Sequence, residues 1–182
     1  MKINIPNILT ITRILLVPLF IIFLIRDLYV SALIVFVCAG LSDGLDGLIA
    51  RYFNQRTELG AYLDPIADKL LIISAFASLA VIKIIPGWLA VIVITRDVLI
   101  LLGIAIFSLT DITIKIKPSL VSKCTTVAQL GTVVFILFNP TISDAVTIKH
   151  YIYWLTAGLS IISGFHYIYK GMNLLQGASI EN

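Results

Sequence analysis

Residues 43–68, DGLDGLIARYFNQRTELGAYLDPIAD, decide how the chain is interpreted, because they place four aspartates between long apolar runs. Asp43 and Asp46 are spaced i, i+3, and Asp64 and Asp68 are spaced i, i+4, so each pair would lie on one face of its own helix. The link between the two helices is only a few residues long, so we expect antiparallel neighbours. The stretch therefore predicts a helical hairpin whose aspartate faces meet.

The sequence around this hairpin has the composition of a membrane protein. The chain has 182 residues, of which 59% are hydrophobic and 13% charged, and its mean hydropathy is +1.05. A transmembrane helix needs about 20 mostly apolar residues. Because open strands cannot cross lipid, we expect an all-α bundle of six transmembrane helices. These helices would lie at roughly 5–25, 29–50, 58–82, 87–109, 119–138 and 149–169.

The predicted helices use nearly the whole chain. We therefore expect residues 1–182 to form a single membrane domain, with no separate soluble one. The first apolar stretch is long enough to span and has no small-residue cleavage pattern after it, so we expect a transmembrane helix there instead of a signal peptide.

The distribution of Lys and Arg predicts the orientation. With a cytoplasmic amino terminus, six basic residues face the cytoplasm and three face the other side, which favours both termini inside. The polar cavity that holds the aspartates would then open to the cytoplasmic side. The net charge of +3 is too thinly spread to indicate nucleic-acid binding. The six are Lys2, Arg51, Arg56, Lys115, Lys117 and Lys170, and the three are Arg26, Lys83 and Lys149.

Carboxylates at membrane depth usually face a cavity, a partner or a metal ion, because their burial is costly. Four of them at one point repel one another unless cations neutralise them. Ligands that are all oxygen favour hard ions such as Mg²⁺, Mn²⁺ or Ca²⁺, and a pair of such ions can clamp a phosphoryl group. The aspartates thus predict a divalent-metal site for a phosphate-bearing substrate. The alternative is a salt-bridge network with Arg51, Lys69 and Arg96.

The same window resembles, without departure, the signature of the CDP-alcohol phosphatidyltransferases. Eight positions at fixed spacing would rarely agree by chance. They are Asp43, Asp46, Gly47, Ala50, Arg51, Gly60, Asp64 and Asp68. The resemblance implies a membrane enzyme of phospholipid biosynthesis that transfers a phosphatidyl group from CDP-diacylglycerol to an alcohol and releases CMP.

The resemblance also implies roles for the residues of the signature. The four aspartates would bind two ions of Mg²⁺ or Mn²⁺ in each active site, and Asp68 would be the general base that takes the proton of the acceptor hydroxyl. A homodimer in a bacterial-type cytoplasmic membrane is expected as well. The residues around the cytidine and the diphosphate would be Asp46, Gly47, Ala50, Arg51 and Gly60.

The beginning of the chain favours glycerol-3-phosphate as the acceptor. Residues 4–13, NIPNILTITR, resemble the start of phosphatidylglycerophosphate synthases, which use that acceptor. An anionic acceptor needs cations in its pocket, and we expect Arg96, Lys123 and Arg13 to bind it. Two alternatives remain open: Arg96 pairs with Asp97 or with an aspartate of the site, and Lys123 extends from a helix start to the membrane interface.

The middle of the chain favours a different acceptor. Thr95–Val98 and Lys117–Leu130 resemble CMP-forming cardiolipin synthases of the same family, which use phosphatidylglycerol. Phosphatidylglycerophosphate synthases more often carry Arg-Glu where this chain has Arg96-Asp97, with a second Arg some residues later that is missing here. Phosphatidylglycerol is therefore the alternative acceptor, and the class of reaction is the same for both.

Two other classes of protein use aspartates in helices. A polytopic prenyltransferase binds a diphosphate in this way, but it would carry longer aspartate motifs in two separate regions, whereas all four aspartates here fall within residues 43–68. A non-enzymatic cation channel or transporter would need a through-path or an inverted repeat, and the sequence shows neither. Release of CMP from a CDP-lipid would indicate the enzyme, and metal flux without turnover would indicate the transporter.

The two cysteines carry no metal or disulfide pattern. Cys38 and Cys124 both fall within predicted helices, so we expect them to be small buried hydrophobic residues.

Overall fold

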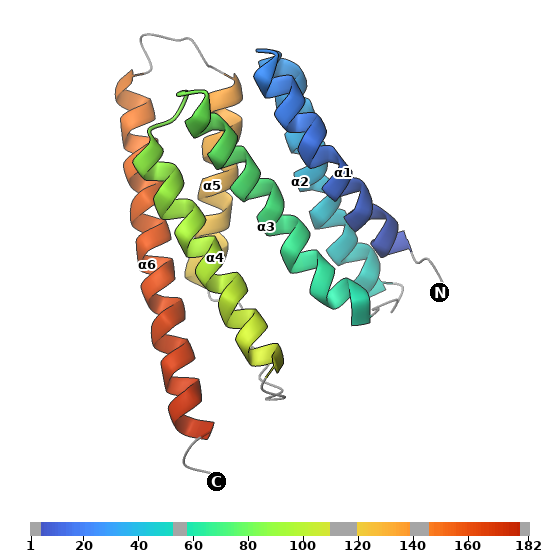
Figure 1. Cartoon of the computed structure of the whole chain (residues 1–182), viewed down its shortest axis with the longest axis vertical. Helices are drawn as coiled ribbons and strands as arrows, with labels where there is room; N and C mark the ends of the chain where they lie inside the picture. Colours follow the sequence, from blue (N-terminus) through green and yellow to red (C-terminus); the bar gives the residue numbers. More distant parts are fainter. Residues whose placement is uncertain (1–4, 53–57, 110–119, 139–145, 179–182) are drawn as a thin grey trace. The chain divides into compact units, whose positions relative to one another are not determined.

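The computed structural model of the chain contains six α-helices (Figure 1). It describes residues 5–52, 58–109, 120–138 and 146–178, and the side chains of residues 11–42, 67–103, 105, 120–138 and 147–173. The described residues include no strand, so the prediction of an all-α fold with six helices is confirmed. The helices are α1 (Ile5–Ile25), α2 (Tyr29–Tyr52), α3 (Glu58–Val81), α4 (Gly87–Leu109), α5 (Leu120–Phe138) and α6 (Val146–Ala178).

The ends of the first five helices agree with the predicted ends to within two residues. The last helix differs, because α6 begins three residues earlier than predicted and ends nine residues later. The prediction followed the apolar run, which ends near residue 169, but the sequence continues with good helix formers such as Lys170, Met172 and Leu174. The helix therefore continues beyond the apolar run as far as Ala178.

The turns after α1 and α3 are short and have the same construction. Each contains one residue in the left-handed conformation, Asp27 with φ 56° and Lys83 with φ 61°. The residue that follows closes the helix end with a hydrogen bond to a carbonyl five positions earlier, as in a Schellman motif. These bonds run from Leu28 N–H to the Phe23 oxygen and from Ile84 N–H to the Leu79 oxygen, each at 2.9 Å.

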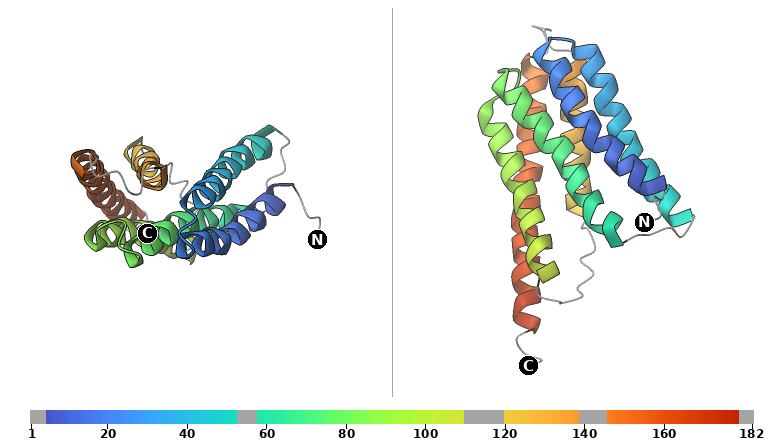
Figure 2. Two further views of the ribbon diagram at one scale, coloured as in Figure 1. Left: turned by 90° about the horizontal axis from the view of Figure 1, so that it is seen from above. Right: turned by 45° about the vertical axis from the view of Figure 1, so that its right-hand side comes forward.

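The chain divides into two compact units, Met1–Gly87 with Val133–Ser143, and Trp88–Thr132 with Asp144–Asn182. In the first unit α1 packs against both α2 and α3, and α2 also contacts α3 (Figures 1 and 2). The rings of Phe20 and Phe36 meet in its interior with their centroids 5.6 Å apart. The single domain over residues 1–182 stays a prediction.

In the second unit α4 and α6 run in parallel. The rings of Trp88, near the start of α4, and Trp154, about two turns into α6, lie 5.2 Å apart. Three turns further along, the Tyr167 hydroxyl of α6 donates a hydrogen bond of 3.3 Å to the Ile100 carbonyl of α4. From the first contact to the second the residue numbers increase in both helices, so α4 and α6 run in the same direction.

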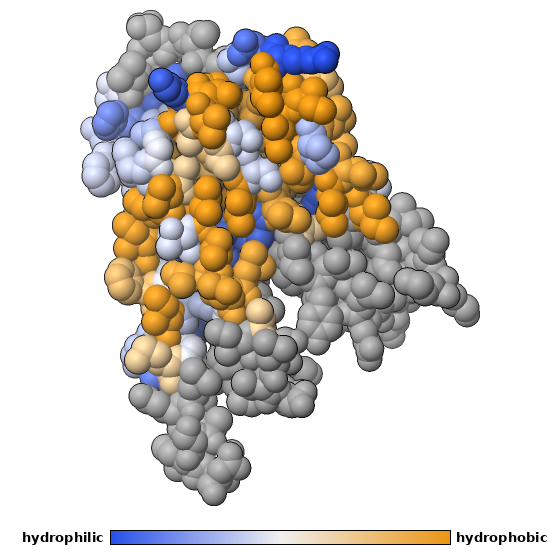
Figure 3. All heavy atoms as spheres, viewed as in Figure 1, coloured by the Kyte–Doolittle hydropathy of each residue, from blue (hydrophilic) through white to orange (hydrophobic). Residues whose placement is uncertain are grey.

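The helices expose apolar side chains and bury charged ones. Large apolar side chains are exposed on each of the six helices, and Figure 3 shows them covering much of the visible described surface. By contrast, Arg13, Lys69, Arg96 and Asp97 are buried, with exposed fractions of 1%, 8%, 3% and 0%. This distribution is the reverse of that in a soluble protein and suits an apolar surrounding.

The helices differ in how well they meet the requirements for crossing a membrane. Among the described residues, Leu120–Phe138 is the one helix that is long and apolar enough by length and composition. Two apolar helical segments, Ile11–Ile25 and Tyr29–Ser42, are shorter. That all six helices cross a membrane stays a prediction.

The prediction that the cysteines are buried is wrong. Cys38 and Cys124 are both exposed and form no disulfide. The outer surface of these helices is itself apolar, so a small hydrophobic side chain is as well accommodated there as in the interior.

Candidate active site

The four aspartates lie in the second half of α2 and the first half of α3. Both helices are continuous through the aspartates, so the predicted i, i+3 and i, i+4 spacings are indeed helical spacings. The end of α2 and the beginning of α3 lie at the same end of the first unit (Figures 1 and 2). Some signature side chains lie outside the described residues, and their contacts stay predictions. These are Asp43, Asp46, Gly47, Ala50, Arg51, Gly60 and Asp64.

Asp68 is the residue of the signature whose side chain is described. This side chain is 28% exposed, so ions and substrate can reach it. Its Oδ2 lies 3.8 Å from Nζ of Lys69, which is too far for a good hydrogen bond, so the contact is a loose ion pair. The alternative to a metal site is a salt-bridge network of the aspartates with basic residues, and among the described residues this contact with Lys69 agrees with it.

The chemistry of the aspartates fits a pair of divalent cations. All four donors are carboxylates, and oxygen donors of this kind select Mg²⁺ or Mn²⁺ over softer metals. Within the part of the chain whose side chains are described, no three His, Cys, Asp or Glu side chains group together. Three of the four aspartates lie outside that part. The two predicted ions therefore rest on the spacing and the donor type.

Arg96 of α4 forms a buried ion pair with its neighbour. Its Nη1 lies 2.5 Å from Oδ1 of Asp97, and the two residues are 3% and 0% exposed. The alternative in which Arg96 pairs with Asp97 is thereby confirmed. Because the pair is buried, the carboxylate of Asp97 compensates the charge of Arg96 where water cannot.

Two serines from other helices also hold the Arg96 guanidinium. Ser163 of α6 accepts hydrogen bonds from Nε at 3.2 Å and from Nη2 at 2.9 Å. Ser122 of α5 accepts from Nη2 through its hydroxyl at 2.7 Å, and its carbonyl oxygen lies 3.4 Å from the same nitrogen. An arginine has five N–H donors. The bonds to Asp97, Ser122 and Ser163 together use four of them. Among the described residues, one N–H of Nη1 has no recorded acceptor.

A line of buried polar side chains joins α5 to α6 behind this cluster, and we call it the polar seam. The hydroxyls of Thr132 and Thr156 lie 2.7 Å apart, and Gln129 Nε2 donates to Ser160 Oγ at 3.4 Å. Thr125 donates to a carbonyl of α6 at 3.1 Å. Along the seam the residue numbers of α5 decrease as those of α6 increase, so the two helices are antiparallel. Such bonds contribute about 0.6 kcal/mol each on average in an apolar surrounding, and together they fix the helix rotation.

The polar seam is absent from the sequence predictions, although a signal for it exists. Its members on α5, together with Ser122, occupy positions 122, 125, 129 and 132, a spacing of three and four that marks one helix face. Positions 156, 160 and 163 of α6 follow the same rule. The pattern shows that each helix has a polar face, but not that the two faces meet.

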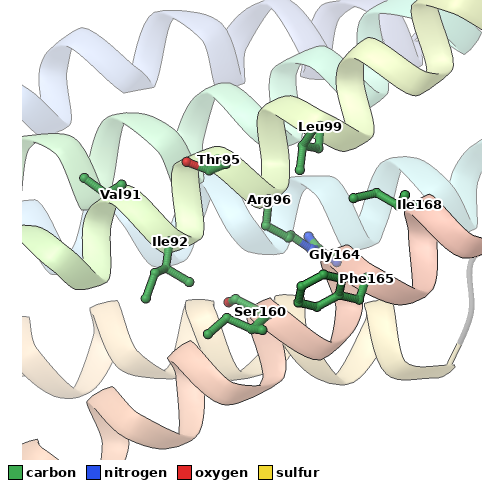
Figure 4. Close-up of a pocket in the computed structure, with 10 residues that line it drawn as sticks. Val91, Ile92, Thr95, Arg96, Leu99, Ser160, Gly164, Phe165 and Ile168 are labelled. Atoms are coloured by element: carbon green, nitrogen blue, oxygen red, sulfur yellow. The ribbon is translucent and has the colours of Figure 1, made fainter.

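An open pocket of about 250 Å³ lies between α4 and α6 (Figure 4). Arg96, Thr95 and Ser160 are polar residues of its lining, and most of the remaining lining is apolar. The Arg96 side chain reaches from α4 toward Gly164 of α6 (Figure 4), where an added Cβ would lie 3.8 Å from Arg96 Cγ. The stem of Arg96 therefore passes against α6 before its head reaches the serines.

The other two cationic residues predicted to bind the acceptor are placed differently. Lys123 is exposed in the first turn of α5, which agrees with the alternative of a side chain extended to an interface. It follows Ser122, so its side chain starts about 100° further around the helix. Arg13 is buried on the face of α1 that also carries Phe20 and Leu24. A role for either residue in acceptor binding stays a prediction.

Comparison with known proteins gives one family and two kinds of relative. Residues 3–162 match the CDP-alcohol phosphatidyltransferase family. Human cardiolipin synthase (CMP-forming) is 36% identical over 190 residues, which cover 95% of this chain and 63% of the human protein. A probable phosphatidylglycerophosphate synthase of Mycobacterium tuberculosis is 33% identical over 184 residues, which cover 96% of this chain and 84% of that protein.

A third relative is the CDP-diacylglycerol–glycerol-3-phosphate 3-phosphatidyltransferase of Bacillus subtilis, 26% identical over 95% of this chain and 97% of that protein. The chain spans less than two thirds of the human and rat cardiolipin synthases, which it covers to 63% and 64%. The family match extends over most of the chain and includes the complete aspartate signature, and this protein belongs to the CDP-alcohol phosphatidyltransferase family.

Proposed function

We propose that this protein is a phosphatidyltransferase of phospholipid biosynthesis that transfers a phosphatidyl group from CDP-diacylglycerol to an alcohol and releases CMP. The observation that carries the proposal is the complete eight-position signature, on α2 and α3, inside a family match over residues 3–162. The membership establishes the family, and the activity of this chain is our inference from it.

We also propose that all six helices span the cytoplasmic membrane, with both termini and the active-site cavity on the cytoplasmic side. Exposed apolar side chains on every described helix and buried charges inside the units support this arrangement. The distribution of Lys and Arg supports the orientation. A homodimer is part of the proposal because the family resemblance implies it.

The proposed chemistry assigns the aspartates two tasks. Asp43, Asp46, Asp64 and Asp68 would hold two Mg²⁺ or Mn²⁺ ions, which supply the positive charge that a diphosphate requires. Asp68 takes the proton of the acceptor hydroxyl as the oxygen of that hydroxyl attacks the phosphorus of the phosphatidyl group. The new phosphorus–oxygen bond forms as the bond to CMP breaks, and CMP leaves with its phosphate.

The nucleotide end of the donor would lie against the small residues of the signature. Gly47, Ala50 and Gly60 have little or no side chain, and the family resemblance implies that they would lie around the cytidine and the diphosphate. Asp46 and Arg51 complete this subsite, in which Arg51 would pair with a phosphate oxygen.

The proposed acceptor is glycerol-3-phosphate, and phosphatidylglycerol is the alternative. Relatives of both kinds match the chain at similar identity, 36% for the human cardiolipin synthase and 33% for the mycobacterial protein. Arg96 is the proposed anchor of the acceptor, because it lines a pocket and keeps one N–H without a recorded acceptor among the described residues. Lys123 and Arg13 would add positive charge.

Arg96→Lys tests the acceptor site. Lysine keeps the charge that Asp97 needs but loses the planar fork, so we expect the KM for the acceptor to rise about tenfold or more. The KM for CDP-diacylglycerol should change less than about twofold on the same scale. Initial rates of CMP release at varied concentrations of each substrate measure both constants.

The matched control is Arg26→Lys, the same change at an exposed arginine after α1. It should leave both KM values as in the wild-type chain. Equal increases in the two KM values for Arg96→Lys would show that Arg96 does not belong to the acceptor site.

A further inference from the structure

The guanidinium of Arg96 is held by two kinds of group with separate effects. Asp97 carries a full negative charge and lies on the same helix, one residue along the chain. Ser122 and Ser163 are uncharged and come from α5 and α6. Asp97 therefore compensates the charge of Arg96, whereas the serines affect the direction of the head group and leave its charge unchanged.

The bonds of the serines fix the plane of the guanidinium. Ser163 Oγ accepts from both Nε and Nη2, which lie on one edge of the planar group. Ser122 Oγ accepts from Nη2 on the adjacent edge at 2.7 Å. Two edges held by separate helices leave no free rotation about the last bonds of the side chain. The N–H of Nη1 that lacks a recorded acceptor among the described residues is thereby held in one place.

The surroundings make this arrangement dependent on the serines. Arg96 is 3% exposed and Ser163 is 2% exposed, so water has little access to replace a lost hydroxyl. The polar seam continues along the same faces of α5 and α6, and its contact between Thr132 and Thr156 lies about two helical turns from Ser163. A buried N–H that loses its acceptor is costly, so the head group would turn to find another one.

We infer that Ser163 and Ser122 are positioning residues for Arg96, which aim its remaining N–H donor at the acceptor substrate. The inference rests on the proposed function, in which Arg96 binds the acceptor. It extends that function by adding residues of α5 and α6 to the acceptor site. It also assigns the direction of the Arg96 head group to the serines and the compensation of its charge to Asp97. The ligand chemistry it implies is an oxygen atom of an alcohol phosphate or of a glycerol headgroup.

Ser163→Ala is the direct test, with CMP release measured at varied acceptor and varied CDP-diacylglycerol. We expect a rise of about tenfold in the KM for the acceptor and a change of less than about twofold in the KM for the donor, as for the loss of a hydrogen bond to a charged group. Ser163→Thr keeps the hydroxyl and should restore the acceptor KM. Ser122→Ala removes one hydroxyl bond to Arg96, whereas Ser163→Ala removes two, so it should have a smaller effect in the same direction.

The matched control is Thr156→Val, which removes another buried hydroxyl of α6, one that bonds to Thr132 and not to Arg96. It should lower thermal stability and leave both KM values unchanged. A second test combines Ser163→Ala with Arg96→Lys. If Ser163 acts through Arg96, the double variant should have the acceptor KM of Arg96→Lys alone. The reason is that the effects of two substitutions in one hydrogen-bond network do not add.

Four outcomes would overturn the inference. Ser163→Ala with an unchanged acceptor KM, or with equal rises in both KM values, would show that the serine has no positioning role. An acceptor KM for the double variant equal to the product of the two single effects would show that Ser163 acts independently of Arg96. A wild-type chain that releases no CMP with any acceptor would overturn the proposed function, and this inference with it.

Discussion

Replacing Asp68 by Asn is expected to lower the rate of CMP release by at least about 10²-fold, the usual contribution of a general base, while the chain stays folded. Asparagine has the same shape but cannot take the proton of the acceptor hydroxyl, and it is a weaker ligand for a divalent cation. Folding should persist because the Asp68 side chain is 28% exposed and its ion pair with Lys69 is loose, at 3.8 Å. The measurement is the initial rate of CMP release at saturating donor and acceptor, with thermal unfolding of the same sample.

The matched control for this variant is Asp27→Asn. Asp27 is exposed in the turn after α1, with φ 56°, a conformation that asparagine also adopts readily. Its activity should equal that of the wild-type chain. A rate for Asp68→Asn above about a tenth of the wild-type rate, well above what loss of a general base leaves, would contradict the role of Asp68 as the base.

Replacing Asp97 by Ala is expected to destabilise the protein by about 3–5 kcal/mol, the usual effect of removing one partner of a buried ion pair. The reason is that Arg96, 3% exposed, would keep its charge without the carboxylate that lies 2.5 Å away. Unfolding by heat or denaturant in detergent measures the loss.

A double variant separates this effect from simple loss of packing. Arg96→Met with Asp97→Leu removes both charges and keeps the volume, so it should be more stable than Asp97→Ala alone. Asp27→Asn, at an exposed site where asparagine also adopts the left-handed conformation, is the control and should have a small effect. Two results would contradict this account of the buried pair: a decrease of less than about 1 kcal/mol in the free energy of unfolding for Asp97→Ala, or a larger decrease for the double variant than for Asp97→Ala.

The sequence predicts the helices well because apolar runs of membrane length are a direct signal. Five of the six helices end within two residues of the predicted positions. The end of α6 could not be predicted in this way, since the helix continues after its apolar run stops at about Tyr169. The burial of Cys38 and Cys124 was predicted wrongly because an apolar side chain in this chain can lie on either side of a helix.

The candidate site is predictable in part. The spacing of the aspartates places them on helices, and the structure shows those helices. The pairing of Arg96 with Asp97 could be foreseen as an alternative because the residues are adjacent. The contacts of Arg96 with Ser122 and Ser163, 26 and 67 residues away, could not, because they depend on how α5 and α6 are rotated toward α4.

The measurement that tests the central claim most directly is CMP release from CDP-diacylglycerol by the purified chain, with and without Mg²⁺, and with glycerol-3-phosphate or phosphatidylglycerol as acceptor. We predict release that depends on the metal, stops when a chelator is added and is supported by glycerol-3-phosphate. Release with phosphatidylglycerol alone would show that phosphatidylglycerol is the acceptor and would leave the proposed class of reaction unchanged. The absence of metal-dependent CMP release with these and other alcohols would contradict the assignment of this chain as a phosphatidyltransferase.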